Sequence, residues 1–154
     1  MPASGRTLLL VGAALNLGLA ALHLIIIFVG APAYLYFGAA SLAQMAEAGS
    51  AEPALITFGL AGIFVAFALY ALSGAGIVGR VPFLTSGLVS IGILFTLRGL
   101  IVVVDVARLI TGAGYPIRQT VFSSAALVIG LVYLLGTLQH RESLRAKQSP
   151  VSGR

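Results

Sequence analysis

The chain has 154 residues, of which 59% are hydrophobic and 8% are charged, and its formal net charge is +5. Ordinary globular domains carry about 45–50% apolar and about 25% charged residues, so a water-soluble globular fold is excluded. The chain contains no cysteine, which excludes disulfides, thiolate metal sites and thiol redox chemistry.

Four apolar stretches are long enough to cross a bilayer as helices. A helical span needs about 20 residues, because each residue rises about 1.5 Å and every backbone amide must be bonded inside the helix. Prolines at or just before the starts of the last three stretches also favour helices there. We therefore predict an all-α integral membrane protein, a four-helix bundle that forms a single transmembrane domain over residues 1–140. The stretches cover residues 8–28, 54–78, 82–104 and 117–138, and an extension of the third to 110 is also open.

The first stretch carries two polar residues, Asn16 and His23. They are seven positions apart and therefore share one face of a helix. A cleaved signal peptide, with Arg6 before the apolar run and Ala31-Pro32-Ala33 as the cleavage site, is the alternative interpretation. The apolar run is longer than a typical signal-peptide core, so we expect a membrane span.

The segment from residue 30 to 52 is expected to lie outside the bilayer. Its aromatic run, Tyr34 to Phe37, is typical of an anchor at the membrane interface. Ser41 and Gln44 have the spacing of a capping box, which predicts a short interfacial helix from there to about Ala48. This helix would cover the outer ends of the bundle, and a role as a lid is the alternative.

The second stretch ends in Gly74-Ala75-Gly76-Ile77-Val78-Gly79, which fits the G-x-G-x-x-G pattern of nucleotide-binding loops. That pattern has meaning only after a strand and at the start of a helix, whereas here it closes a membrane helix. Pairs of small residues four apart instead predict close contacts between helices. These pairs are Gly62/Ala66, Ala75/Gly79, Ser86/Ser90 and Ala126/Gly130.

The third stretch contains Arg98 and Asp105, which are seven residues apart and share a face. We place the outer ends of the third and first stretches near Val104 and Phe28. At a rise of about 1.5 Å per residue, Arg98 then lies about 9 Å and His23 about 7–8 Å below the outer boundary of the bilayer. Three interpretations of Arg98 are open: snorkelling to the headgroups, a structural contact with Asp105 or a carbonyl, and a functional site. Asp105 could also pair with Arg108 on the same helix.

The distribution of basic residues predicts that both termini are cytoplasmic. Arg6, Arg80 and four residues of the 141–154 segment fall on one side, against Arg108 and Arg118 on the other. The 141–154 segment is a basic cytoplasmic tail expected to attract anionic lipid, and its lack of aromatic residues argues against nucleic acid. The high ratio of arginine to lysine favours a bacterial inner membrane.

The function predicted from these positions is a small-molecule or ion binding or transport module with an outward-facing polar pocket. A neutral His23 bonded to a serine, a carbonyl or Asn16 is one interpretation of the histidine, and proton exchange is the other. A lone histidine in the membrane predicts neither a metal site nor a cofactor. The candidate ligand-binding residues are His23, Arg98, Asp105, Asn16, Thr57 and Ser123.

A second hypothesis is a non-catalytic accessory or scaffold subunit of a larger membrane complex. Its small-residue pairs would then contact a partner, and the polar residues would only fix the helix register. A chain of this size is expected to form a homo-oligomer or to bind a membrane-complex partner. No serine, histidine and acid recur at the spacing of a catalytic triad, so an enzyme is not favoured.

Overall fold

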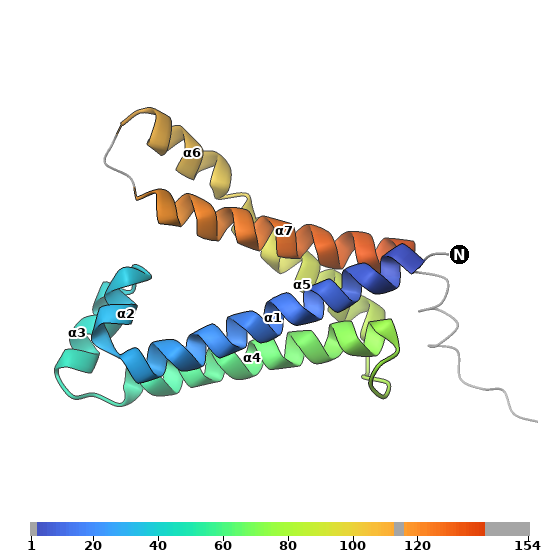
Figure 1. The fold of residues 1–154 in the computed structure, drawn as a ribbon, viewed down its shortest axis with the longest axis horizontal. Coiled ribbons are helices and arrows are strands. Elements are labelled where there is room, and N and C mark those ends of the chain that lie inside the picture. Colours follow the sequence, from blue (N-terminus) through green and yellow to red (C-terminus); the bar gives the residue numbers. More distant parts are fainter. Residues whose placement is uncertain (1–2, 113–115, 141–154) are drawn as a thin grey trace, which may run out of the picture. The chain divides into compact units, whose positions relative to one another are not determined.

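The structure is a computed structural model that describes residues 3–112 and 116–140, all of whose regular elements are helices. The predicted basic tail lies outside the described residues, as does its proposed contact with anionic lipid. Seven helices follow one another along the described chain (Figure 1). They are α1 (Ala3–Val29), α2 (Ala31–Tyr36), α3 (Ala40–Glu47), α4 (Glu52–Ala75), α5 (Leu84–Gly99), α6 (Val102–Ile110) and α7 (Ile117–Gln139).

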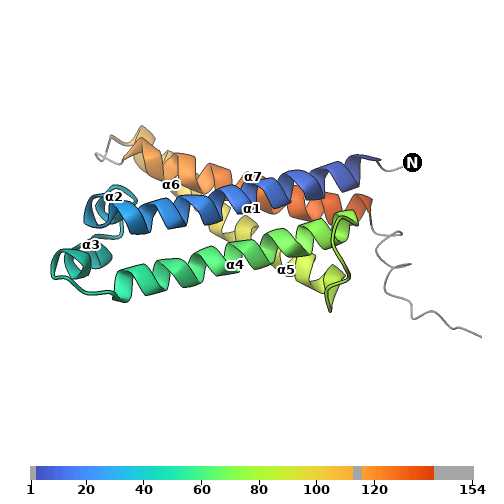
Figure 2. The same ribbon diagram turned by 60° about the horizontal axis from the view of Figure 1, so that its bottom comes forward.

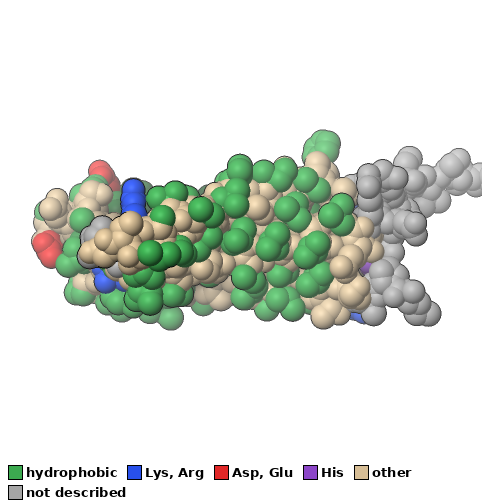
Figure 3. Space-filling model, turned by 90° about the horizontal axis from the view of Figure 1, so that it is seen from above, with side chains coloured by type: hydrophobic (Ala, Val, Ile, Leu, Met, Phe, Trp, Pro, Cys, Tyr) green, Lys and Arg blue, Asp and Glu red, His purple; other side chains and the backbone are tan. Residues whose placement is uncertain are grey.

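Four helical segments of the described chain are long and apolar enough to cross a membrane, and they match the four predicted stretches. Only 22–33% of the residues in the most apolar part of each segment are buried. Figure 3 shows hydrophobic side chains spread along the visible face of the described residues. Such a surface suits lipid rather than water, so the chain is compatible with a multi-pass membrane bundle. The segments are Ser4–Val29, Glu52–Ala75, Leu84–Ile110 and Ile117–Gln139.

Contacts divide the chain into two compact units. The α5–α7 unit combines Met1–Ala13 with Leu69–Arg154, and the α2–α3 unit is Ala14–Ala68. Helices α1 and α4 run from one unit into the other. The prediction of one transmembrane domain over residues 1–140 stays a prediction.

Helices α5 and α7 pack closely in the α5–α7 unit because glycines line their contact. A Cβ atom added at Gly130 would overlap the backbone of Thr96 and approach the carbonyl oxygen of Gly92. The predicted small-residue pair Ala126/Gly130 therefore packs within the chain, where both residues are buried. The unit's fully buried side chains include Leu9, Leu84, Leu88 and Tyr133.

The third span is interrupted at Leu100 and Ile101, between α5 and α6. No proline causes this break. Gly99 favours helix poorly, and the β-branched residues 101–104 that follow lose side-chain freedom in a helix. The amide of Val103 bonds to the carbonyl of Leu100 at 3.1 Å, which is the tighter three-residue pattern. Beyond the break α6 lies along the first part of α7 (Figures 1 and 2).

The α2–α3 unit has its core where the two short helices pack on the end of α1. Ile26 of α1 forms this core together with Ala33 and Tyr34 of α2 and Ala43 of α3. Helix α3 starts near the predicted place, but Ala39 is its N-cap residue and no side chain caps it. The predicted Ser41 capping box is therefore wrong, since Ser41 already lies inside the helix.

Glycine conformation explains where two helices of the described chain end. Gly76 follows α4 with a φ of 77°, a left-handed conformation that glycine adopts at little cost. The second span therefore stops at Ala75, before the predicted end at residue 78. Gly30 has a φ of 76° and separates α1 from α2, a helix that the sequence analysis treated only as an aromatic anchor.

Candidate functional site

The six predicted ligand-binding residues are divided between the two units. Arg98, Asp105 and Ser123 belong to the α5–α7 unit, and Asn16, His23 and Thr57 belong to the α2–α3 unit. A pocket formed by all six residues stays a prediction.

The structure brings Arg98, Ser123 and Asp105 together from three helices. The Ser123 hydroxyl on α7 donates a hydrogen bond to Oδ2 of Asp105 on α6, at 2.5 Å. The same hydroxyl oxygen accepts a bond from Nη1 of Arg98 on α5, at 3.2 Å. A serine therefore links a guanidinium to a carboxylate, and hydrogen bonds to charged groups are the stronger kind.

Asp105 is the only buried residue of α6, with 1% of its surface exposed. The apolar residues of the same helix are exposed instead, Val103 at 67% and Ile110 at 79%. A helix in water would show the opposite pattern, whereas a helix in lipid turns its charged group toward protein. The carboxylate is thus held inside the α5–α7 unit, where Ser123 satisfies one of its oxygens.

Arg98 combines a fixed position with free hydrogen-bonding capacity. Its side chain is exposed and lies in the last turn of α5, where a positive charge suits the helix dipole. The bond to Ser123 is its single hydrogen bond to the part of the chain that the structure describes. The remaining N–H donors of the guanidinium are therefore open to a ligand, and their planar fork matches a carboxylate or a phosphate.

His23 contacts its own helix and an aromatic side chain. Its Nδ1 lies 2.7 Å from the carbonyl oxygen of Leu19, one turn earlier in α1. A carbonyl can only accept, so Nδ1 carries the proton in this bond and a neutral ring keeps Nε2 as an acceptor. The ring centroid of Phe64 lies 4.8 Å from that of the imidazole. Of the predicted partners of a neutral His23, a carbonyl is the observed one.

Thr57 takes part in a hydrogen-bonded chain that joins α2 to α4. Its hydroxyl donates to the carbonyl of Pro53 at 2.7 Å and lies 2.9 Å from the hydroxyl of Tyr34. Since the Thr57 proton is used by Pro53, Tyr34 is the donor in the second bond. Thr57 and Tyr34 are both buried. Thr57 thus anchors α2, and sequence analysis missed Tyr34, whose aromatic ring suggested only an interfacial position.

Asn16 is fully buried within α1. Among residues 3–112 and 116–140 no group of three or more histidine, cysteine or acidic side chains could hold a metal ion.

Comparison with known proteins finds no matching protein family, no matching curated protein and no matching solved structure.

Proposed function

We propose that the protein is a small-molecule binding or transport module for anionic ligands, and that Arg98 is the ligand-binding residue. The observation that carries this proposal is the Ser123 bridge, which links the exposed guanidinium of Arg98 to the buried carboxylate of Asp105. Most N–H donors of that guanidinium have no partner among the described residues. The alternative interpretation, snorkelling, is less favoured because the Arg98 side chain bonds to α7.

Each residue of the cluster has a role in reversible binding. Arg98 would take the carboxylate or phosphate group of the ligand through parallel N–H donors. The negative charge of Asp105 offsets that of the guanidinium, which weakens the attraction for a second anion and so allows release. Ser123 links the two through its own hydrogen bonds. A site of moderate affinity is what transport requires.

The surroundings of the site belong to the same proposal. By the distribution of basic residues, both termini are cytoplasmic and Arg98 lies in the outer third of the bilayer, most simply a bacterial inner membrane. Helices α2 and α3 would lie at the outer interface, where the exposed side chains of Leu35 and Tyr36 contact lipid. His23, with Nε2 as acceptor, would exchange a proton during transport.

The test uses acetate and phosphate as probes. Purified protein in neutral detergent is titrated with each salt at constant ionic strength, with sodium chloride as the reference, and the melting temperature is measured. We expect at least one probe to raise the melting temperature. In Arg98→Gln the apparent affinity for that probe should fall about tenfold or more, because hydrogen bonds to a charged group are lost.

Arg6→Gln is the matched control, because it removes one arginine whose Nε bonds to the carbonyl of Ala75. Its affinity for the probe should equal that of the unmodified protein. Uptake of the labelled probe into proteoliposomes then separates transport from binding. No stabilisation by either anion, or equal affinity after Arg98→Gln, would overturn the proposal.

An accessory role or self-association is the second candidate, and one observation favours it. Gly59, Gly62 and Ala66 are exposed on one side of α4, and a Cβ atom added at either glycine would meet nothing within 4 Å. Small exposed residues allow another helix to approach closely. Because the chain has no cysteine, Gly62→Cys gives a single thiol. Disulfide-linked dimers in membranes would indicate a homo-oligomer, and their absence would argue against this face.

A further inference from the structure

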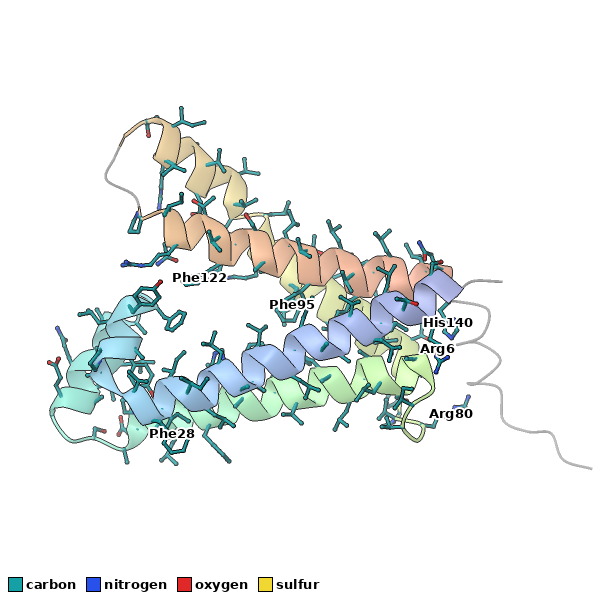
Figure 4. The ribbon with its side chains drawn as sticks, viewed as in Figure 1. Arg6, Phe28, Arg80, Phe95, Phe122 and His140 are labelled. Atoms are coloured by element: carbon teal, nitrogen blue, oxygen red, sulfur yellow. The ribbon has the colours of Figure 1, made fainter. Side chains whose placement is uncertain are left out.

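The turn between α4 and α5 carries an unused positive charge. Arg80 is exposed, and its guanidinium makes no hydrogen bond to residues 3–112 or 116–140. It lies at the edge of a hollow of about 390 Å³ lined by Arg80, Val81, Pro82, Phe83 and Leu84. Figure 4 shows Arg6 and Arg80 at the same end of the α5–α7 unit. The acidic side chains of the described chain, Glu47, Glu52 and Asp105, all belong to other segments.

Phe83, the N-cap residue of α5, has a backbone conformation that suits glycine. Its φ is 52° and its ψ is 36°, and it is the only residue besides glycine with a positive φ in the described chain. A bulky side chain in this left-handed region is costly. The ring is nevertheless 82% exposed, so contacts inside the fold do not compensate for that cost. The exposed ring of Phe83 is therefore placed to contact another molecule.

A second hollow shares Phe83 with the first. It has a volume of about 590 Å³ and is lined by Phe83, Thr85, Ser86 and Val89. These residues follow the first turns of α5, and at 1.5 Å per residue they extend about 9 Å along a membrane-spanning helix. The two hollows together join a positive charge at the helix end to a surface that runs along the span.

We propose that this turn binds an anionic phospholipid, with the phosphate on Arg80 and the start of an acyl chain along Thr85 to Val89. Phe83 lines both hollows and contacts the lipid at the level of the glycerol. Charge complementarity selects an anionic headgroup, and the second hollow selects a lipid over free phosphate. The site is independent of the proposed function, because Arg98 lies at the far end of α5, about 20 Å away along the helix.

The test measures lipid retention by native mass spectrometry of the full-length protein in neutral detergent. Dioleoyl phosphatidylglycerol and dioleoyl phosphatidylcholine are added in equal amounts. We expect phosphatidylglycerol to be retained in preference to phosphatidylcholine. Arg80→Gln should reduce that preference about fivefold, the effect of one basic residue at an anionic surface. Arg6→Gln, the control, should change it by less than about twofold because its charge bonds within the chain.

Phe83→Gly separates lipid binding from folding. Glycine removes the left-handed strain, so the melting temperature without lipid should be unchanged or higher, while phosphatidylglycerol retention falls. The proposal is wrong if retention is unaffected by both Arg80→Gln and Phe83→Gly. It is also wrong if phosphatidylcholine is retained equally. Competition by inorganic phosphate at millimolar concentration would show a free-phosphate site and likewise overturn it.

Discussion

In the α5–α7 unit charged side chains from different helices meet at a serine, whereas in the α2–α3 unit the corresponding link is neutral. Arg98 and Asp105 both bond to Ser123, and Tyr34 bonds to Thr57. In the α2–α3 unit His23 bonds to a carbonyl of its own helix. Charged side chains in lipid carry a high free-energy cost, and those found there usually have a functional role. The α5–α7 unit therefore links two charged groups, as the proposed ligand site requires, and the α2–α3 unit uses its neutral link to join α2 to α4.

The helical glycines of the two units also differ, in how closely other atoms approach them. Gly130 faces backbone atoms of α5, while a Cβ atom added at Gly18, Gly59 or Gly62 would meet nothing within 4 Å. Close backbone approach holds α5 against α7 and so positions Arg98 opposite Ser123. The packing that positions the candidate site should thus be the least tolerant part of the chain.

The largest expected loss of stability is therefore that caused by Gly130→Ala. The new methyl group would overlap the backbone of Thr96 and approach the carbonyl oxygen of Gly92, and neither can move without shifting α5. We expect the free energy of unfolding to fall by about 3 kcal/mol, at the upper end of typical overpacking costs. Unfolding in mixed micelles, followed by circular dichroism, measures it.

Gly62→Ala is the matched control because its added methyl group meets open space. Its stability should be unchanged or higher by up to about 1 kcal/mol, since alanine favours helix more than glycine does. Equal destabilisation by the two substitutions would contradict the contrast between the units.

A smaller effect is expected from Ser123→Ala, which removes both hydrogen bonds of the serine bridge. Interhelical hydrogen bonds in membranes contribute about 0.6 kcal/mol on average and about 1.7 kcal/mol at most, and the charged partners favour the upper value. Ser124→Ala is the control, because among the described residues the Ser124 hydroxyl bonds only to the carbonyl of Thr120, one turn earlier. If both variants unfold at the same denaturant concentration, the bridge contributes nothing to stability.

The sequence predicts the four spans well because their length and hydropathy depend on lipid alone. It does not predict the break at Leu100, since no proline marks it and the weak helix formers on either side are common in membrane helices. Ser41 has the right spacing for a capping box, yet Ala39 is the N-cap residue of α3. Such boundaries depend on packing against α1, which local spacing does not reveal.

The candidate site is predictable in part. The seven-residue spacing of Arg98 and Asp105 places them on one side, and both reach Ser123 although α5 and α6 are separate helices. Thr57 is a candidate ligand-binding residue by sequence, yet its hydroxyl bonds to Tyr34, a contact that depends on how α2 folds. The sequence predicts how far along a helix a residue lies, but it does not predict how a neighbouring helix such as α2 is oriented.

The smallest effect expected is that of Tyr34→Phe, which tests the neutral link of the α2–α3 unit. The substitution keeps the buried ring and removes only the hydroxyl that donates to Thr57. Thr57 retains its bond to Pro53, so no buried donor is left unsatisfied and the loss should be about 1 kcal/mol or less. Hydrogen exchange of the α2 amides should become faster, because this bond holds α2 to α4.

Tyr36→Phe is the control, since the Tyr36 side chain is 57% exposed. Faster exchange in Tyr36→Phe alone would show that the hydroxyl of Tyr34 does not anchor α2.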